Sequence, residues 1–307
     1  MKGIAILGVM VGHTYWLPEA VRIGVYAFHI PLFFIIAGYF AKTWEKGTGW
    51  QYMRLNAKRL LLPYLITAAV CCCYGLFRAL YNHDWNMVTH TLVRYLVAMD
   101  HTWPGTLFDI WVAPIWFLLA LFWGRIIFFY ISRLGRWTLP VCVVLSGLMV
   151  FLHPYIPLPL GLGWSIEALV FMAVGRAYRQ YGCPLWLKII AVACCALSMY
   201  LDRIDICAFT FHCWPVDVLG ACGGTLLVYY LSKGIARSFM RPFFVWCGQH
   251  SLAILCIHNI AMDITAVHWL NRHLPFSLPV KVYHCFKHLF TLCFAWAFSL
   301  IRKSLTP

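Results

Sequence analysis

Charged residues are scarce in this sequence. Asp, Glu, Lys and Arg together make up 11% of its 307 residues, and only 10 residues are acidic, whereas 63% are hydrophobic. This composition is too apolar for a soluble domain of this length. It predicts an all-α, polytopic membrane protein, because a helix satisfies its own backbone hydrogen bonds in lipid.

Several other features are missing. The 14 cysteines, among them Cys71, Cys72 and Cys73, lie mostly in apolar runs without metal-ligand spacing, so neither a disulfide framework nor a metal site is predicted. The first apolar segment has no basic leader and no small-residue cleavage motif, which favours a retained helix over a signal peptide. No internal repeat, low-complexity tract or soluble domain interrupts the chain. We therefore expect one membrane-embedded domain over residues 1–307.

Hydropathy and chain breaks predict about ten transmembrane helices. The expected spans are residues 2–16, 24–41, 61–80, 111–131, 138–153, 164–178, 187–201, 216–232, 243–262 and 285–301. With residue 2 on the cytoplasmic side, most Lys and Arg residues fall in cytoplasmic segments, and most acidic residues fall in outer ones. Because basic residues accumulate on the cytoplasmic side of membranes, both termini are predicted to be cytoplasmic.

The excess of basic residues bears on the partners of the protein. A formal net charge of +14 would suggest nucleic acid as the partner of a soluble protein. Here the basic residues follow the loops between spans, so membrane lipids, and no nucleic acid, are the expected partners. The longest outer segment, residues 82–110, contains Trp85, Trp103 and Pro104 and is expected to lie along the membrane interface as a partly helical lid.

The first span, KGIAILGVMVGH at residues 2–13, places two ionisable groups in an apolar wall. Eleven residues at 100° each bring Lys2 and His13 to the same face of a helix. Gly8 and Gly12 form a G-x-x-x-G pattern that lets another helix approach closely. We therefore expect His13 to face protein or a cavity rather than lipid, the alternative being a purely structural histidine near a helix end.

The second span, FHIPLFFIIAGYF at residues 28–40, brings a second histidine to the same depth. His13 and His29 both lie within about a turn of the outer end of their helix. Pro31 lacks a backbone donor and frees a carbonyl nearby, which membrane helices tolerate where a polar group satisfies it. Two imidazoles beside unsatisfied backbone indicate a site.

A basic cluster precedes the third span in MRLNAKRLLLPYL, residues 53–65. Arg54, Lys58 and Arg59 are spaced i, i+4 and i+5 at the start of a helix. Guanidinium and ammonium groups bind phosphates well, so the cluster is a candidate anion clamp. A cytoplasmic anchor of the positive-inside kind is the alternative, and both roles are compatible.

Four later residues are candidates for the site. Trp116 begins the span PIWFLLALFWGR, where an interfacial aromatic residue is also expected. Glu167 lies inside an apolar span, where a carboxylate must be paired or protonated; Asp217 is nearer a helix end and ranks lower. His258 and Asn259, in GQHSLAILCIHN, lie deep in the ninth span and suit either substrate binding or a hydrogen bond between helices.

These segments together resemble the acyltransferase-3 family of integral membrane O-acyltransferases, in particular its fucose 4-O-acetylase-like branch. The resemblance rests on the order of KGIAILGVMVGH, FHIPLFFIIAGYF, KRLLLPYL, IWFLLALF and SLAILCIHN along nearly the whole chain. In that family an Arg or Lys, followed eleven residues later by His, opens the first helix. The second helix reads approximately F-x-x-P-L-F-F-x-x-S-G, and Ala37 stands here in place of the usual Ser.

The resemblance implies a ten-helix fold in the bacterial inner membrane. It also implies transfer of an acyl group, here acetyl, from cytoplasmic acetyl-CoA to a hydroxyl of a sugar, glycan or lipid-linked saccharide, with no metal cofactor. His13 takes the catalytic role, and Lys2 stands where the family more often has Arg.

The residues then suggest a division of labour. We expect the basic cluster to hold the phosphates of acetyl-CoA, with Lys2 near the donor and His13 acting as general base. His29 orients the acceptor or donates to the oxyanion, and Glu167 orients a histidine. Trp116, His258 and Asn259 are the predicted substrate-binding residues. Direct transfer and a covalent acyl-histidine are both open.

Two other classes of function remain open from the sequence. Intramembrane His and Glu residues also build the pathways of transporters and flippases, so a transporter for a glycan or a small polar solute is the alternative. A scaffolding membrane protein is a third. Assembly as a homo-oligomer is open as well.

Overall fold

The computed structural model describes residues 1–42, 45, 48–100, 113–202, 204–264 and 279–305. Within these ranges the chain is helical apart from turns, loops and one isolated bridge between Asp205 and Thr210. The all-α class predicted from composition is therefore confirmed. The predicted interfacial segment is described up to Asp100, whereas Trp103 and Pro104 lie outside the described residues.

The first half of the chain forms short and long helices in alternation. They are α1 Lys2–Gly12, α2 Glu19–Tyr26, α3 His29–Tyr39, α4 Gly49–Asn56, the π-helical η1 Ala57–Leu61, α5 Leu62–Asn82, α6 Asn86–Leu92, the π-helical η2 Val93–Val97, α7 Trp116–Ile131, the 3₁₀ turn η3 Ser132–Trp137 and α8 Thr138–Leu152.

The second half contains longer helices. They are α9 Leu162–Glu167, α10 Leu169–Tyr181, α11 Leu185–Leu201, α12 Trp214–Ile235, α13 Arg241–Gln249, α14 Ser251–Ile264 and α16 Val280–Leu305. Each of the ten predicted spans thus coincides with helix over most of its described length.

Five helical runs are long and apolar enough to cross a membrane, or six when α13 and α14, bent by 76° at His250, count as one. Two predicted spans, 111–131 and 138–153, fall in one run, Trp116–Leu152, which contains Gly135 at φ +58°. α1 and α11 are apolar but shorter. The chain is therefore a multi-pass membrane protein, while the figure of ten crossings and the side of each terminus stay predictions.

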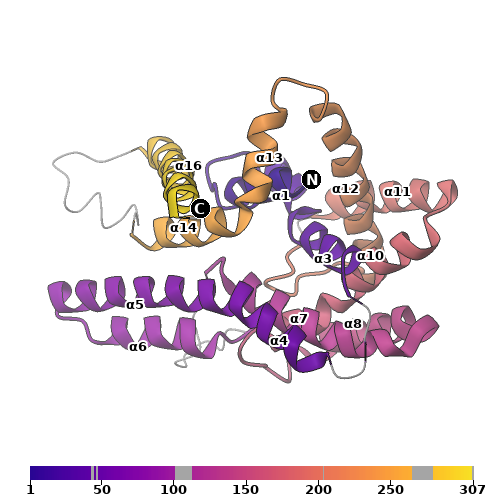
Figure 1. Ribbon diagram of the computed structural model, residues 1–307, viewed down its shortest axis with the longest axis horizontal. Coiled ribbons are helices and arrows are strands. Elements are labelled where there is room, and N and C mark those ends of the chain that lie inside the picture. The colour runs from indigo at the N-terminus through magenta and orange to yellow at the C-terminus, as the bar shows by residue number, and fades with distance from the viewer. Residues whose placement is uncertain (43–44, 46–47, 101–112, 203, 265–278, 306–307) are drawn as a thin grey trace.

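Helix α1 lies inside the bundle, in contact with α2, α3, α13 and α14 (Figure 1). α10 packs along α3, and α11 packs along α12. At one end of the molecule α5 and α6 run side by side, and α11 lies toward the opposite end (Figure 1). α1 is thereby surrounded by protein over most of its length.

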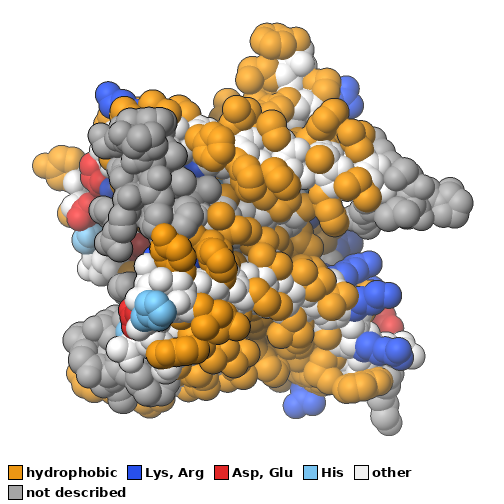
Figure 2. Space-filling view, turned by 90° about the vertical axis from the view of Figure 1, so that its left-hand side faces the viewer, with side chains coloured by type: hydrophobic (Ala, Val, Ile, Leu, Met, Phe, Trp, Pro, Cys, Tyr) orange, Lys and Arg blue, Asp and Glu red, His pale blue; other side chains and the backbone are white. Residues whose placement is uncertain are grey.

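The outer surface is largely apolar. Figure 2 shows a broad hydrophobic face with Lys and Arg gathered mainly along one edge. Large side chains such as Leu65 and Phe77 of α5 and Ile189 of α11 are exposed on the helices. A surface of this kind suits contact with lipid chains, which need no hydrogen-bond partner.

Helices α3 and α10 approach each other through glycine. A methyl group added at Gly38 would overlap the carbonyl oxygen of Met172, and one added at Gly175 would overlap the carbonyl oxygen of Ile35. Backbones approach this closely only where side chains are absent. Gly38 and Gly175 therefore fix the distance between the two helices.

We predict that Gly175→Ala destabilises the protein, because its methyl group must push backbone apart in a packed interface. The expected loss is about 1–3 kcal/mol in the free energy of unfolding, the usual cost of overpacking. The melting temperature of the purified protein in detergent measures it. Gly234→Ala is the matched control, since nothing lies within 4 Å of a methyl group at that position. Equal melting temperatures for both variants would contradict the close α3–α10 packing.

Candidate active site

A cavity of about 610 Å³ lies within the bundle, between α1, α3, α7 and α14. Lys2, His13, His29 and Trp116, all predicted from the sequence as site residues, line it. Much of the rest of the wall is apolar, including Ile6, Val9, Ile30, Phe33, Phe117, Leu118, Leu121, Leu252 and Leu255. A largely apolar cleft with a few converging polar groups is the usual form of a small-molecule site.

Helix α1 supplies both ends of one wall. Lys2 is its first residue and His13 caps its C-terminal end, and both line the cavity, so the common face predicted from the helical period is confirmed. The glycines act as the sequence predicts, since a methyl group at Gly8 would lie 3.3 Å from Cβ of His29. At Gly12 it would lie 3.1 Å from the ring of Tyr26.

His29 is the first residue of α3, so its ring stands at the break between α2 and α3. Its Nδ1 lies 2.9 Å from the carbonyl oxygen of Val25, to which it donates, and the ring of Tyr26 lies edge-on at 4.8 Å. With Nδ1 engaged, Nε2 is the nitrogen available to a ligand. Pro31 lies in the first turn of α3, where a missing N–H removes no helical bond.

Trp116 is held in place by residues outside the cavity. Its ring packs 4.7 Å from that of Trp164. Oδ1 of Asn259 accepts a hydrogen bond of 3.2 Å from the backbone N–H of Ile115, at the start of α7. Nδ2 of Asn259 donates to the hydroxyl of Tyr95 at 3.1 Å. Asn259 is fully buried and does not line the cavity, so its described contacts support Trp116.

The cavity also contains an ion pair that the sequence did not single out. Arg94 and Asp263 line it and lie 3.4 Å apart, and the hydroxyl of Tyr95 donates to Asp263 at 2.6 Å. Arg22, which pairs with Glu19 at 2.7 Å, lines the cavity as well. Arg94 and Asp263 are 169 positions apart, and no local spacing pattern connects them.

Two further predicted site residues, His258 and Glu167, also lie outside the cavity. His258 is fully buried behind His13, with ring centroids 5.7 Å apart, and neither of its ring nitrogens has a partner among the described residues. Glu167 is fully buried at the end of α9, its carboxylate has no described partner, and only its backbone carbonyl accepts, from Ser146. Neither residue lines the cavity, and their predicted roles stay predictions.

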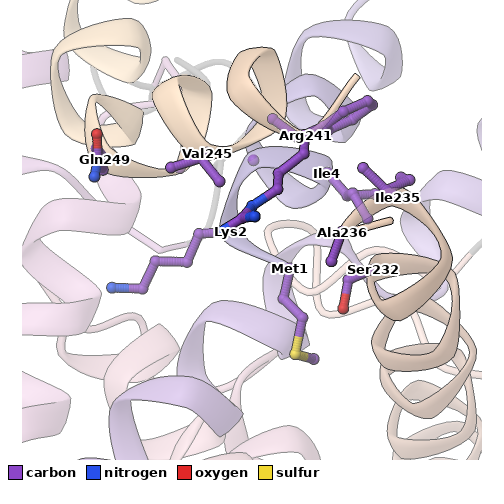
Figure 3. Close-up of a pocket in the computed structure, with 12 residues that line it drawn as sticks. Met1, Lys2, Ile4, Ser232, Ile235, Ala236, Arg241, Val245 and Gln249 are labelled. Atoms are coloured by element: carbon purple, nitrogen blue, oxygen red, sulfur yellow. The ribbon is translucent and has the colours of Figure 1, made fainter. Parts of the chain in front are cut away.

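A second cavity, of about 460 Å³, lies between the start of α1, the end of α12 and α13. Lys2 and Arg241 line it, with Ser232 nearby (Figure 3). Lys2 lines both cavities, so both border the start of α1. Among the described residues, no cluster of His, Cys, Asp or Glu side chains could hold a metal ion.

The predicted anion clamp lies outside both cavities. Arg54, Lys58 and Arg59 are exposed on α4 and η1. Leu60, the residue after Arg59, is buried and lines the larger cavity. The cluster is therefore next to the cavity in the chain, because Leu60 follows Arg59, but it does not line the cavity. Its phosphate-binding role stays a prediction.

Comparison with known families agrees with this geometry. The acyltransferase-3 model, described as an acyltransferase domain, matches residues 1–300. The chain belongs to this family. It is therefore a membrane acyltransferase, whereas the branch suggested by its motifs stays a prediction. No match was found among curated proteins or among solved structures.

The buried carboxylate of Asp100 lies behind the cavity wall of this acyltransferase, where it contacts Leu158 and Gly163. Asp100, 3% exposed, accepts a 2.8 Å hydrogen bond at Oδ1 from the N–H of Leu158, and its own N–H donates to the Leu158 carbonyl. Oδ2 has no described partner and packs against Gly163 of α9. The next residue, Trp164, supports Trp116. Burial raises the pKa of Asp100 from 3.8 to about 6.

We predict that Asp100→Asn stabilises the protein above pH 6. A carboxyl whose folded pKa is raised binds more protons when folded, so the wild type loses stability as pH rises from about 4 to about 6. A shift of this size corresponds to about 3 kcal/mol at most. The variant should melt higher than wild type at pH 7.5 and equally at pH 4. Asp84→Asn, at an exposed carboxylate, is the control. If the melting temperatures of Asp100→Asn and wild type differed by the same amount at both pH values, the raised pKa of Asp100 would be contradicted.

Proposed function

We propose that this acyltransferase is an O-acetyltransferase of the bacterial inner membrane. It moves acetyl from cytoplasmic acetyl-CoA to a hydroxyl of a sugar or cell-surface glycan. The observation that carries the proposal is the single cavity that joins a basic end at Lys2 to two histidines, His13 and His29. Acyl transfer from acetyl-CoA to a hydroxyl calls for a cationic site for the phosphates of CoA, a narrow channel for the pantetheine arm and a base beside the attacking hydroxyl.

The donor is expected to enter at the start of α1. Lys2 lines both cavities, and Arg241 lines the smaller one. The exposed residues Arg54, Lys58 and Arg59 lie on the chain just before the cavity residue Leu60. Cations bind phosphate oxygens through charge-assisted hydrogen bonds. The apolar wall formed by α1 and α7 then suits the thin pantetheine arm.

In the reaction, His13 removes the proton of the acceptor hydroxyl as its oxygen bonds to the thioester carbon. The carbon–sulfur bond then breaks, and the proton passes from His13 to the departing thiolate, which leaves as the free thiol of CoA. General-base assistance of this kind contributes about 10²–10⁴-fold in rate. His29 either orients the acceptor or donates from Nε2 to the oxyanion. An acyl-histidine intermediate is an equally open route.

The acceptor is expected to bind beside Arg94, Asp263 and Trp116. A carboxylate and a guanidinium offer an acceptor and a donor to neighbouring hydroxyl groups. An aromatic face suits the apolar side of a sugar ring. All three residues line the cavity that contains His13, so a saccharide bound there places a hydroxyl within its reach.

We predict that His13→Ala lowers acetyl transfer by at least about 10²-fold, because the hydroxyl then lacks its base. The measurement uses purified protein and labelled acetyl-CoA, with the released CoA thiol and the acetylated acceptor followed together. His90→Ala, at an exposed histidine of α6, should keep wild-type turnover. Transfer by His13→Ala at the wild-type rate removes His13 from the mechanism, and a wild type that never consumes acetyl-CoA favours the transporter.

A second prediction concerns the basic cluster. Replacing Arg54 and Arg59 by Glu should raise the KM for acetyl-CoA about tenfold or more and leave the KM for the acceptor nearly unchanged, because phosphate contacts are lost. Replacing Arg133 and Arg136 by Glu makes the same change in net charge at exposed residues of η3. The assignment is wrong if both double variants behave alike, or if only the KM for the acceptor changes.

A further inference from the structure

Lys287 of α16 is a cation with almost no access to solvent. Its exposed fraction is 1%, and its Nζ donates a 3.1 Å hydrogen bond to the backbone carbonyl oxygen of His13. The ring of Tyr283, one turn earlier on α16, lies 5.8 Å from Nζ. Lys287 lies within the predicted span 285–301, and no local sequence pattern links it to α1.

The surroundings of this ammonium group hold no described carboxylate partner. The ion pairs among the described residues join Arg22 to Glu19 and Arg94 to Asp263. The ionisable side chains grouped around it are imidazoles. His258 of α14 lies between His13 and His288, at 5.7 and 5.8 Å between ring centroids, and His284 lies 6.2 Å from His288.

A charge in this position is costly unless a specific contact compensates it. The compensation here comes from the end of a helix. α1 ends at Gly12 with His13 as its cap, and the last carbonyls of a helix lack intrahelical donors and carry partial negative charge. Lys287 supplies a hydrogen-bond donor to the carbonyl of the cap residue, and it places a positive charge at the negative end of the helix dipole.

The next residue of α16 makes a second contact with the same end of α1. The hydroxyl of Thr14 donates its only hydrogen to the carbonyl of Met10 at 3.0 Å. Nε2 of His288 lies 2.7 Å from the same hydroxyl oxygen, so Nε2 must be the donor. Consecutive residues of α16 thus bind the two residues that directly follow α1, and this pairing fixes the rotation of α1 at its end.

We propose that Lys287 is a positioning residue for His13. It anchors the backbone from which the imidazole projects into the cavity, without lining the cavity itself. The inference rests on the proposed function only where it assigns His13 the part of the base. The anchoring itself is independent of the reaction.

The test compares Lys287→Met, which keeps the length of the side chain and removes the charge, with Lys281→Met on the same helix. Lys281 is exposed, its Nζ lies 5.8 Å from the Trp16 ring, and it makes no described contact with His13. Diethyl pyrocarbonate, which carbethoxylates accessible unprotonated imidazole, probes each histidine by mass spectrometry. His29 lines the same cavity and provides an internal reference.

In Lys287→Met we expect the carbethoxylation rate of His13 to rise about threefold or more while that of His29 stays within about twofold. Loss of a helix-end anchor frees the last residue first. kcat should fall about tenfold with little change in either KM, because misplacement of a base affects the transition state. Lys281→Met should match wild type in every measurement.

The possible outcomes separate this inference from the proposed function. Unchanged reactivity of His13 in Lys287→Met overturns the anchoring, and so does an equal rise at His13 and His29, which indicates general loosening. If Lys287→Met does not fold, Thr14→Val, which removes the neighbouring contact, should raise the reactivity of His13 in the same selective way, and an unchanged His13 there also overturns the proposal. A selective rise at His13 together with a fully active His13→Ala upholds the anchoring and removes the proposed mechanism.

Discussion

The close packing of α1 against its neighbours is the constraint on which the site depends. Three glycines of this helix each meet a different segment of the chain. Gly3 faces the backbone of α13 at Phe244, Gly8 faces His29 at the start of α3, and Gly12 faces Tyr26 at the end of α2. Side chains at these positions would push the neighbours away. Because they are absent, α1 contacts protein closely on several sides, while the face with Lys2 and His13 remains open to the cavity.

The part of the site that follows from helical periodicity could be predicted from the sequence. Lys2 and His13 share a face because eleven residues make three turns plus about 20°. His29 shares their cavity because both histidines lie at helix ends, and the order of motifs indicated the family. The bend of 76° at His250 was not predicted, because residues 243–262 were expected to form one span although Gly248, Gln249 and Ser251 interrupt its apolar run.

Contacts between distant segments could not be predicted. Asn259 was expected to bind substrate, yet its described hydrogen bonds join it to Ile115, Tyr95 and Cys71. Asp263 and Lys287 acquire their partners from segments far away in the chain. Polarity inside an apolar span shows that a residue matters. Whether it faces the cavity or supports another element depends on helix rotation and tilt, which tertiary packing determines.

The charge around His13 bears on how the proposed reaction is stabilised. In many hydrolases a carboxylate orients the catalytic histidine and stabilises its protonated form. Here no described carboxylate contacts His13, and two cations lie near it, with Lys287 at its carbonyl and Arg22 in the same cavity. Asp263 also lines the cavity, but it is paired with Arg94. Positive charge stabilises an oxyanion and a departing thiolate better than it stabilises an imidazolium. The arrangement therefore stabilises negative charge on the reacting acyl group and disfavours a long-lived imidazolium at His13. In the proposed reaction the proton thus passes from His13 to the thiolate soon after it leaves the hydroxyl.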